Sequence, residues 1–308
     1  MTAYMALDPR PAARQTMLEL LSTPTFGVEV TVPELGLACL LGNADPQHTG
    51  GRADMSAIEG LAALFRGEAQ VATVLPDLDS LGSMAVLDIA MDAIAQLGAL
   101  AGEILRRIEL IGRADRFERG EWPGRRPLPT LDQPWSDVLS GASDTRELAA
   151  MGAVVADHRL PVEERVRLLR IWLSTGEEPL EYRQRVEAER AEMLAALTGG
   201  EILVREAAKG HIATVVSTHR AGMAIGYHRA PVVVAQNPAF SFKGSAPVVK
   251  FTIAQFRVGY VDLSAALTEL AGREPGWGGS PTIGGSPQGV SSGLSLDEVV
   301  AVVEAHLL

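Results

Sequence analysis

The stretch VATVLPDLDSLGSMAVLDIA, residues 71–90, contains the features from which the fold of the rest of the chain can be interpreted. A short and partly β-branched apolar run stops at Pro76, as a buried strand would. Asp77 and Asp79 follow, and Ser80 then leads into a long apolar segment that predicts a helix. Two carboxylates therefore stand at the end of a predicted buried strand, immediately before a helix.

The composition describes a chain long enough for two domains, since one domain usually takes roughly 100–200 residues. Of its 308 residues, 47% are hydrophobic, which is enough for a sizeable core. The formal net charge of −11 argues against binding of long nucleic acid, which requires a basic surface. It permits a small phosphorylated ligand beside a metal cation. The single cysteine, Cys39, excludes an intrachain disulfide and a cysteine-rich zinc site, which fits a reducing compartment.

Neither a signal peptide nor a membrane span is predicted. The first 21 residues have no basic n-region and no continuous apolar core. No stretch of about 18 apolar residues is free of charged or polar interruptions. We therefore expect a cytoplasmic protein.

The order of the predicted elements indicates an α/β protein in which a mostly parallel sheet is covered by helices. Apolar runs at 36–42 and 69–75 predict buried strands, and helical spacing at 54–67 predicts a helix between them. Residues 113–147 are rich in Arg, Pro and Gly and should be irregular. Two further helices are expected, at 160–176 and 179–198.

The predicted boundaries divide the chain into a large domain (1–160), a helical linker (161–200) and a smaller C-terminal α/β domain (201–308). Three β-branched runs in the last part predict its strands. Ser295 is followed three residues later by Glu298, which predicts a capping box at the start of a final helix.

The aspartate pair predicts a metal site. Ligands of open α/β sheets bind at the carboxyl ends of strands, and two carboxylates so close repel each other unless a cation binds them. Oxygen ligands suit Mg²⁺ or Mn²⁺, and the start of the following helix suits an anion. The structural alternative is that Asp77 caps the helix and Asp79 is solvated.

The segment TVLPDLDSLGSMAVL (73–87) resembles the first motif of the DHH phosphoesterase superfamily. That motif is a strand running into an aspartate, one spacer, a second aspartate, a small residue and a glycine that opens an apolar helix. KFTIAQF (250–256) followed by GWGGSPTIGGSPQG (276–289) resembles the glycine-rich signature of the family's C-terminal substrate-binding domain. The resemblance implies a metal-binding phosphoesterase domain, a helical linker and a substrate-binding domain, with the active cleft between the domains.

The resemblance also implies an enzyme that holds two divalent ions, Mn²⁺ or Mg²⁺, and hydrolyses a small phosphorylated substrate by a metal-activated water. Suitable substrates are a nucleotide, a short oligonucleotide or a phosphometabolite. Asp77 and Asp79 match the two aspartates of the motif. Thr73 stands where relatives usually carry a histidine, and the Asp-His-His tripeptide of the family is absent.

Other residues are candidates to complete the site. Asp45 and His48 follow the first predicted strand, and Asp115 is a later aspartate of the kind the family uses, although it could equally be a solvated loop carboxylate. Asp157 and His158 partly match the missing tripeptide, but they precede a helix start and suit surface or capping roles as well. The predicted metal ligands are Asp45, His48, Asp77, Asp79 and Asp115. The predicted catalytic residues are Asp77, Asp79 and His48.

The C-terminal glycine-rich loop is predicted to bind substrate. Its backbone N–H groups have little steric cover and could close on an anion, although such loops are also common as plain turns. Lys250 could reach a phosphate or a carboxylate. The predicted substrate-binding residues are Ser80, Lys250, Gly278, Gly279, Gly284, Gly285, Ser286 and Gln288.

The expected partner is a small phosphorylated ligand, with neither long nucleic acid nor a membrane, and a homodimer is allowed. A function of another class stays open, because the same scaffold without hydrolysis would serve as a nucleotide-binding or regulatory protein. A cofactor-dependent transferase has less support, since the chain contains no P-loop and no strong dinucleotide fingerprint.

Overall fold

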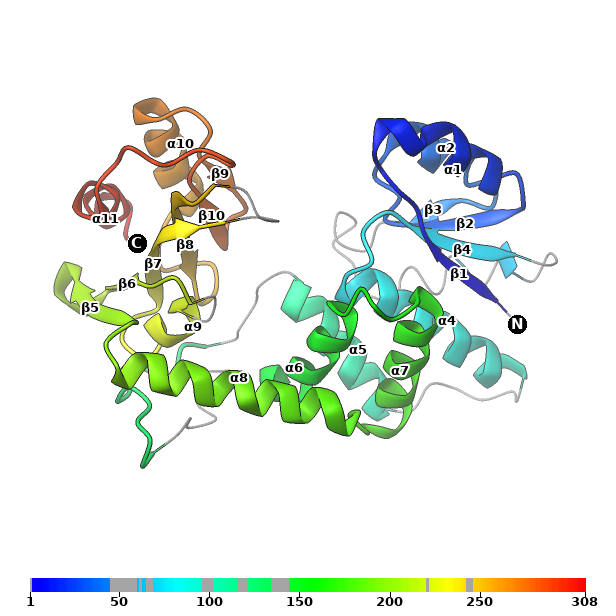
Figure 1. Ribbon diagram of the computed structural model, residues 1–308, viewed down its shortest axis with the longest axis horizontal. Helices are drawn as coiled ribbons and strands as arrows, with labels where there is room; N and C mark the ends of the chain where they lie inside the picture. Colours follow the sequence, from blue (N-terminus) through cyan, green and yellow to red (C-terminus); the bar gives the residue numbers. More distant parts are fainter. Residues whose placement is uncertain are drawn as a thin grey trace. The chain divides into compact units, whose positions relative to one another are not determined.

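The computed structural model describes residues 2–44, 60, 63–64, 69–95, 102–115, 121–133, 144–219, 222–241 and 246–308. The contacts divide the chain into two compact units: unit 1 comprises residues 1–116 and 146–186, and unit 2 comprises residues 117–145 and 187–308. Each unit has its own sheet and its own helices (Figure 1). The predicted α/β class is confirmed.

Unit 1 contains a four-stranded sheet in the order β1-β4-β2-β3. Its strands are β1 (Ala3–Ala6), β2 (Thr25–Val28), β3 (Asn43–Ala44) and β4 (Gln70–Thr73). All three pairings are parallel, with Gly27 of β2 opposite Ala72 of β4 on one side and Asn43 of β3 on the other. Because the strands are parallel, their carboxyl ends all lie at one edge of the sheet.

Helices cover both faces of this sheet (Figure 1). The helical segments of the first 186 residues include η1 (Pro11–Ala13), α1 (Arg14–Leu20), α2 (Pro33–Ala38), α4 (Leu78–Ala95), α5 (Gly102–Asp115), α6 (Asp144–Val155) and α7 (Val162–Thr175). Successive residues of β4 face opposite sides, so Val71 packs in the core with α4 and Ala72 packs in the core under α1 and α2. Helix α4 also packs against α5 and α7, and Trp172 of α7 is fully buried.

The predicted strand at 36–42 is wrong. Pro33 lies in the first turn of α2, where its missing N–H costs nothing, and it starts a helix in place of a strand. Leu35 is fully buried, while Leu37 and Leu40 are 85% and 71% exposed. A short apolar run does not by itself distinguish a strand from a helix. The prediction missed three strands of this sheet, β1, β2 and β3.

The domain boundaries also differ from those expected. Helix α7 packs on α4 inside unit 1 and is not part of a separate linker, while α8 (Leu180–Thr198) begins in unit 1 and ends in unit 2. The described residues 121–133 are irregular, as predicted, but they belong to unit 2, where Trp122 Nε1 donates to the Tyr227 carbonyl at 2.8 Å. The ends of the segment predicted to be irregular are helical, in α5 and α6. Of the helix predicted at 54–67, only residues 60, 63 and 64 are described, and they are helical.

Unit 2 contains a six-stranded sheet in the order β5-β6-β7-β8-β10-β9. Its strands are β5 (Leu203–Ala207), β6 (Ile212–Val216), β7 (Val232–Phe240), β8 (Val248–Gln255), β9 (Gly278–Gly279) and β10 (Ile283–Gly285). Its shorter helical segments are η3 (Ala208–Gly210), α9 (Gly222–Gly226), α10 (Leu263–Arg273) and α11 (Leu296–Ala305). Only β6 and β7 pair in parallel; the other pairings are antiparallel. The predicted capping box of Ser295 and Glu298 is confirmed at the start of α11.

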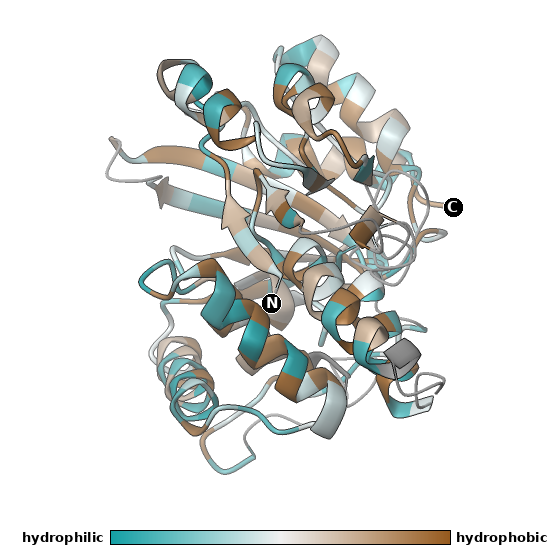
Figure 2. Ribbon diagram, turned by 90° about the vertical axis from the view of Figure 1, so that its right-hand side faces the viewer, coloured by the Kyte–Doolittle hydropathy of each residue, from teal (hydrophilic) through white to brown (hydrophobic). Residues whose placement is uncertain are grey.

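Helices of the molecule carry both teal and brown residues in Figure 2, as expected of helices that bury one face against a core. Among the described residues, no helix combines the length and the apolar character that crossing a bilayer would require.

Candidate functional site

The carboxyl edge of the unit 1 sheet brings three carboxylates together. Glu29 follows β2 directly, and Asp77 and Asp79 follow the neighbouring strand β4. One carboxylate oxygen of each residue lies within 4.8 Å of the corresponding oxygens of the other two. Glu29 and Asp79 are buried, at 6% and 3% exposure, and Asp77 is partly exposed. We call these three residues the acidic cluster.

Asp77 is the residue before α4 and caps that helix. Its Oδ1 accepts a hydrogen bond from the Ser80 N–H at 3.3 Å, and its own N–H donates to Ser80 Oγ at 3.2 Å. Ser80 Oγ donates in turn to the Leu75 carbonyl at 2.7 Å. These bonds fix the turn between β4 and α4. They also occupy the fully buried Ser80 hydroxyl, which was predicted to bind substrate.

Asp79 lies in the first turn of α4, with its side chain inside the protein. Among the described residues, no donor lies within hydrogen-bonding distance of either of its carboxylate oxygens. Leaving a buried carboxylate without a donor is costly. The capping alternative is therefore correct for Asp77, whereas the solvated alternative is wrong for Asp79.

The cluster shifts the proton affinity of Asp79. Burial is the largest cause, and together with the adjoining Asp77 carboxyl and the charges of Asp77, Glu29 and Asp115 it raises the pKa of Asp79 from 3.8 to about 9. A carboxyl can donate a hydrogen bond to another carboxylate only when it is protonated, so without a cation the cluster retains a proton. A divalent cation would offset the repulsion between the carboxylates and would take the place of the missing hydrogen-bond donor.

The backbone at Glu29 is held in an uncommon conformation. Its φ of 54° lies in the left-handed region, which costs of order 1–3 kcal/mol for a residue other than glycine. The Glu29 N–H donates to the Ala44 carbonyl at 2.7 Å. The Val30 N–H donates to Asn43 Oδ1, and Asn43 Nδ2 donates to the Val30 carbonyl, both at 3.1 Å. The end of β3 thus fixes the turn that places the Glu29 carboxylate beside Asp79.

The other predicted metal ligands have different positions. Asp115 ends α5, and its charge reaches Asp79, so the structure brings it near the cluster. Asp45 and His48 lie outside the described residues. Thr73, where the resemblance would predict a histidine, is fully buried; its hydroxyl donates to the Leu75 carbonyl and accepts from the Leu75 N–H, both at 3.2 Å.

Asp157 and His158 lie in the turn between α6 and α7. The Asp157 carboxylate receives hydrogen bonds from Arg159 Nε at 2.8 Å and from the Tyr182 hydroxyl at 3.0 Å, while His158 is exposed. Arg159 holds the pKa of Asp157 well below its usual range. Asp157 is therefore a structural carboxylate of this turn.

Sequence reasoning missed Glu29. The run TFGVEV (25–30) carries the signal that could have revealed it, because an aromatic and β-branched stretch reaches a carboxylate just as 71–77 does. Because 36–42 was predicted as the strand, the similarity between residues 25–30 and 71–77 was missed.

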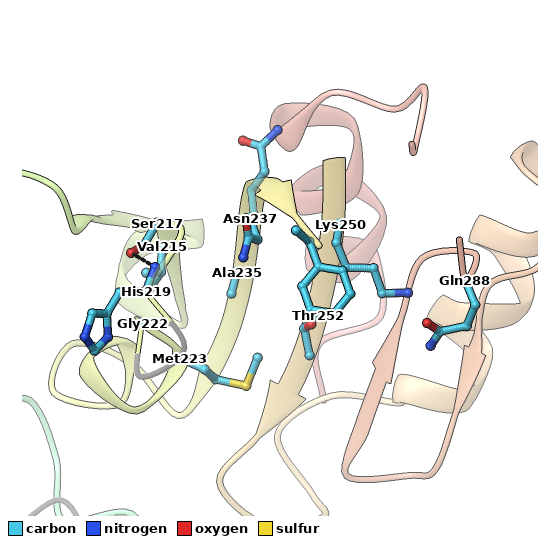
Figure 3. A pocket seen from close by; sticks show the side chains of 12 residues that line it. Val215, Ser217, His219, Gly222, Met223, Ala235, Asn237, Lys250, Thr252 and Gln288 are labelled. Carbon is cyan, nitrogen blue, oxygen red and sulfur yellow. Dashed lines mark hydrogen bonds between the residues drawn. The ribbon is translucent and has the colours of Figure 1, made fainter. Parts of the chain in front are cut away.

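In unit 2, a pocket of about 290 Å³ opens beside β6, β7 and β8. Figure 3 shows Lys250 extending from its strand toward Gln288, with Ser217 and His219 on the opposite side of the pocket. A second hollow of about 430 Å³ shares Lys250, Thr252 and Gln288 with the first. It brings together six of the predicted substrate-binding residues: Lys250, Gly278, Gly284, Gly285, Ser286 and Gln288.

The hairpin β9–β10 at this hollow contains Gly278, Gly279, Gly284 and Gly285, and close packing explains three of these four glycines. A Cβ on Gly284 would lie 2.4 Å from Leu267 Cδ1, and one on Gly285 would lie 2.8 Å from the Phe251 carbonyl oxygen. A Cβ on Gly279 would lie 2.3 Å from the Gly284 Cα. The predicted loop is therefore a pair of short strands in this part of the chain.

Lys250 is the cation of this hollow. Its ammonium group donates to the carbonyls of Ser286 and Pro287, and burial lowers its pKa. An ammonium has three N–H donors, so one is left for an anion. Ser286 Oγ accepts from the Phe251 N–H at 3.0 Å and holds the hairpin against β8.

No protein-family model matches the chain, and no match is found among curated proteins. Fold and site therefore define the class: a two-unit α/β protein with a buried acidic cluster at the carboxyl edge of a parallel sheet and a lysine-containing hollow on a mixed sheet.

Proposed function

We propose that the protein is a divalent-metal-dependent phosphoesterase that acts on a small phosphorylated substrate. The observation that carries this proposal is the buried Asp79 carboxylate, which has no donor among the residues that the structure describes and has two further carboxylates within ligand distance. A set of oxygen ligands suits Mn²⁺ or Mg²⁺. The likeness of residues 73–87 to the first DHH motif supports the reaction class.

The proposed roles follow from these positions. Glu29, Asp77 and Asp79 would hold a cation, and Asp115, whose charge acts on Asp79, is the candidate to contribute to a second one. Bound there, divalent cations neutralise phosphate charge and lower the pKa of a coordinated water. Lys250, in unit 2, keeps one N–H for an anionic group. The net charge of −11 favours a nucleotide, short oligonucleotide or phosphometabolite over long nucleic acid.

A second function, a nucleotide-binding or regulatory protein without hydrolysis, is favoured by one observation. The Thr73 hydroxyl at the family's histidine position is engaged with the Leu75 backbone. It offers no imidazole to a metal or a water.

The test combines metal binding with hydrolysis. Mn²⁺ binding to chelator-treated protein is measured by calorimetry for the wild type, Glu29→Gln, Asp77→Asn and Asp79→Asn. The matched control is Asp132→Asn, which changes an exposed carboxylate. We expect each cluster variant to weaken binding about tenfold or more, a loss of about 1.4 kcal/mol, with the control unchanged. Release of phosphate from a nucleotide panel should require Mn²⁺ or Mg²⁺.

Three outcomes separate the alternatives. Metal-dependent phosphate release that is lost in the cluster variants supports the enzyme. Metal and nucleotide binding without hydrolysis under any divalent cation supports the binding protein. Absence of metal binding by the wild type overturns the metal site itself.

A further inference from the structure

The Asn43 side chain closes the turn that follows β2. Asn43 is the first residue of β3, the edge strand beside β2, where it pairs with Gly27. Its Oδ1 accepts from the Val30 N–H and its Nδ2 donates to the Val30 carbonyl, both at 3.1 Å. An amide is the side-chain group that supplies an acceptor and a donor side by side, as a backbone peptide does. The Asn43 amide therefore continues the pairing of the two strands past Glu29.

Two glycines leave room for this amide. A Cβ on Gly27 would lie 2.5 Å from Asn43 Oδ1, and one on Gly36 would lie 3.2 Å from Asn43 Nδ2 and 2.9 Å from the Val30 carbonyl oxygen. Neither glycine has a positive φ, so close packing and not the backbone conformation requires glycine there. Residues of β2 and α2 thus enclose the amide, and it is a fixed part of the fold.

The turn closed in this way carries Glu29 in its left-handed conformation, with a φ of 54°. The Glu29 N–H donates to the Ala44 carbonyl at 2.7 Å, and its carbonyl accepts from the Thr31 N–H at 2.9 Å. A residue other than glycine disfavours this conformation, so it persists only where neighbouring contacts impose it. Without the amide that holds Val30, φ of Glu29 would return to a negative value. The Cα–Cβ bond would then point elsewhere and carry the carboxylate out of the acidic cluster.

We propose that Asn43 is a positioning residue of the metal site: its side-chain amide holds the turn at 29–30 so that the Glu29 carboxylate can share a cation with the rest of the acidic cluster. The inference rests on the metal site proposed above and adds a residue that is not itself a ligand. Partners that orient metal ligands typically account for about 10–100-fold in metal affinity. Because Asn43 acts through Glu29, its effect on the metal should disappear when the Glu29 carboxylate is removed.

A double-mutant cycle tests the proposal. Mn²⁺ binding to the chelator-treated full chain is measured by calorimetry for the wild type, Asn43→Ala, Glu29→Ala and the double variant. We expect Asn43→Ala to weaken Mn²⁺ binding by about tenfold in the wild type, but by less than about twofold in the Glu29→Ala background. A general loosening of β3 would weaken binding in both backgrounds, so this difference separates positioning from a merely structural role.

Gln70→Ala is the matched control. The Gln70 amide also joins segments of the unit 1 sheet, but at the amino ends of its strands, where Nε2 donates to the Leu20 carbonyl at 2.9 Å and to Thr25 Oγ1 at 2.7 Å. Three residues of β4 separate it from the carboxyl end, roughly 10 Å of strand. Its loss should leave the Mn²⁺ affinity within about twofold of the wild type.

Gly36→Ala is a second variant, which takes the place of Asn43→Ala in the cycle if circular dichroism shows that variant to be unfolded. It displaces the amide without changing Asn43, and alanine favours the α2 helix in which it lies. It should also weaken Mn²⁺ binding only while the Glu29 carboxylate is present.

The outcomes separate this inference from the proposed function. A wild type that binds no Mn²⁺ would overturn the metal site and the positioning role with it. If the wild type binds Mn²⁺, two results would overturn the positioning role alone. One is an unchanged affinity in folded Asn43→Ala, and the other is an equal loss of affinity with and without the Glu29 carboxylate.

Discussion

At the scale of single residues, Asp79 departs furthest from ordinary behaviour. Its acidic side chain is 3% exposed and has two neighbouring carboxylates, and the described part of the chain provides no donor for its oxygens. Glu29 adds a strained backbone at the same place. Such costs cluster at functional sites, where they are tolerated because ligand binding offsets them.

The raised pKa of Asp79 gives a pH prediction for the metal-free protein. Between about pH 4, where the carboxyl of the unfolded chain ionises, and about pH 9, where it ionises in the folded protein, only the folded state holds the proton. The free energy of unfolding should therefore fall as pH rises through this range.

Asp79→Asn removes this titration, so the variant should lose less stability with pH than the wild type, by about 1–3 kcal/mol. Urea unfolding at pH 5, 7 and 9 in chelator measures the difference. Parallel pH profiles for the two proteins would show that Asp79 has an ordinary pKa.

At the scale of elements, the turn before α4 and the β9–β10 hairpin both depend on small residues, but for different reasons. Asp77 and Ser80 define where the helix begins, and this leaves Asp79 facing the protein interior. In the hairpin, the absence of side chains lets the strands lie against β8 and α10.

The hairpin predicts a contrast between two of its glycines. Gly284→Ala would drive a methyl group into Leu267 and should destabilise the protein by about 1–3 kcal/mol. Gly278→Ala, which meets nothing within 4 Å, should change stability by less than about 1 kcal/mol. Urea unfolding followed by far-ultraviolet circular dichroism and by tryptophan fluorescence measures both.

Leu267→Ala opens the space that the new methyl group needs. The double variant with Gly284→Ala should therefore lose less stability than the two single changes added together. Strict additivity would rule out the contact with Leu267 as the cause.

At the scale of the whole molecule, each unit has its own sheet and its own buried apolar core. The acidic cluster belongs to unit 1 alone, and the Lys250 hollow belongs to unit 2. Ligands of the different sites should therefore stabilise different parts of the chain.

Mn²⁺ at about 100 times its dissociation constant should stabilise unit 1 by about 2.7 kcal/mol. Hydrogen exchange measured by mass spectrometry should show slower exchange in β2, β4 and α4 and little change in β6, β7 and β8. Glu29→Gln should abolish the effect. Equal slowing in both units would contradict a cation site confined to unit 1.

The sequence by itself determined the α/β class, the strand at 69–75 followed by a helix, the three main strands of unit 2 and the capping box at Ser295. These are local features, since periodicity, proline and capping residues act over a few neighbouring positions. It also identified Asp77 and Asp79 as the centre of the candidate site. The strand predicted at 36–42 was wrong because strands and helices bury short apolar runs equally well.

Only the tertiary structure decided what surrounds those aspartates and which segments pack together. Glu29 is 48 positions before Asp77 in the chain and reaches it because β2 and β4 are parallel neighbours. The burial that raises the pKa of Asp79, and the docking of residues 121–133 on unit 2, likewise depend on contacts between distant segments. Strand pairing and burial are set by the energy of the whole packed fold, which no short stretch of sequence contains.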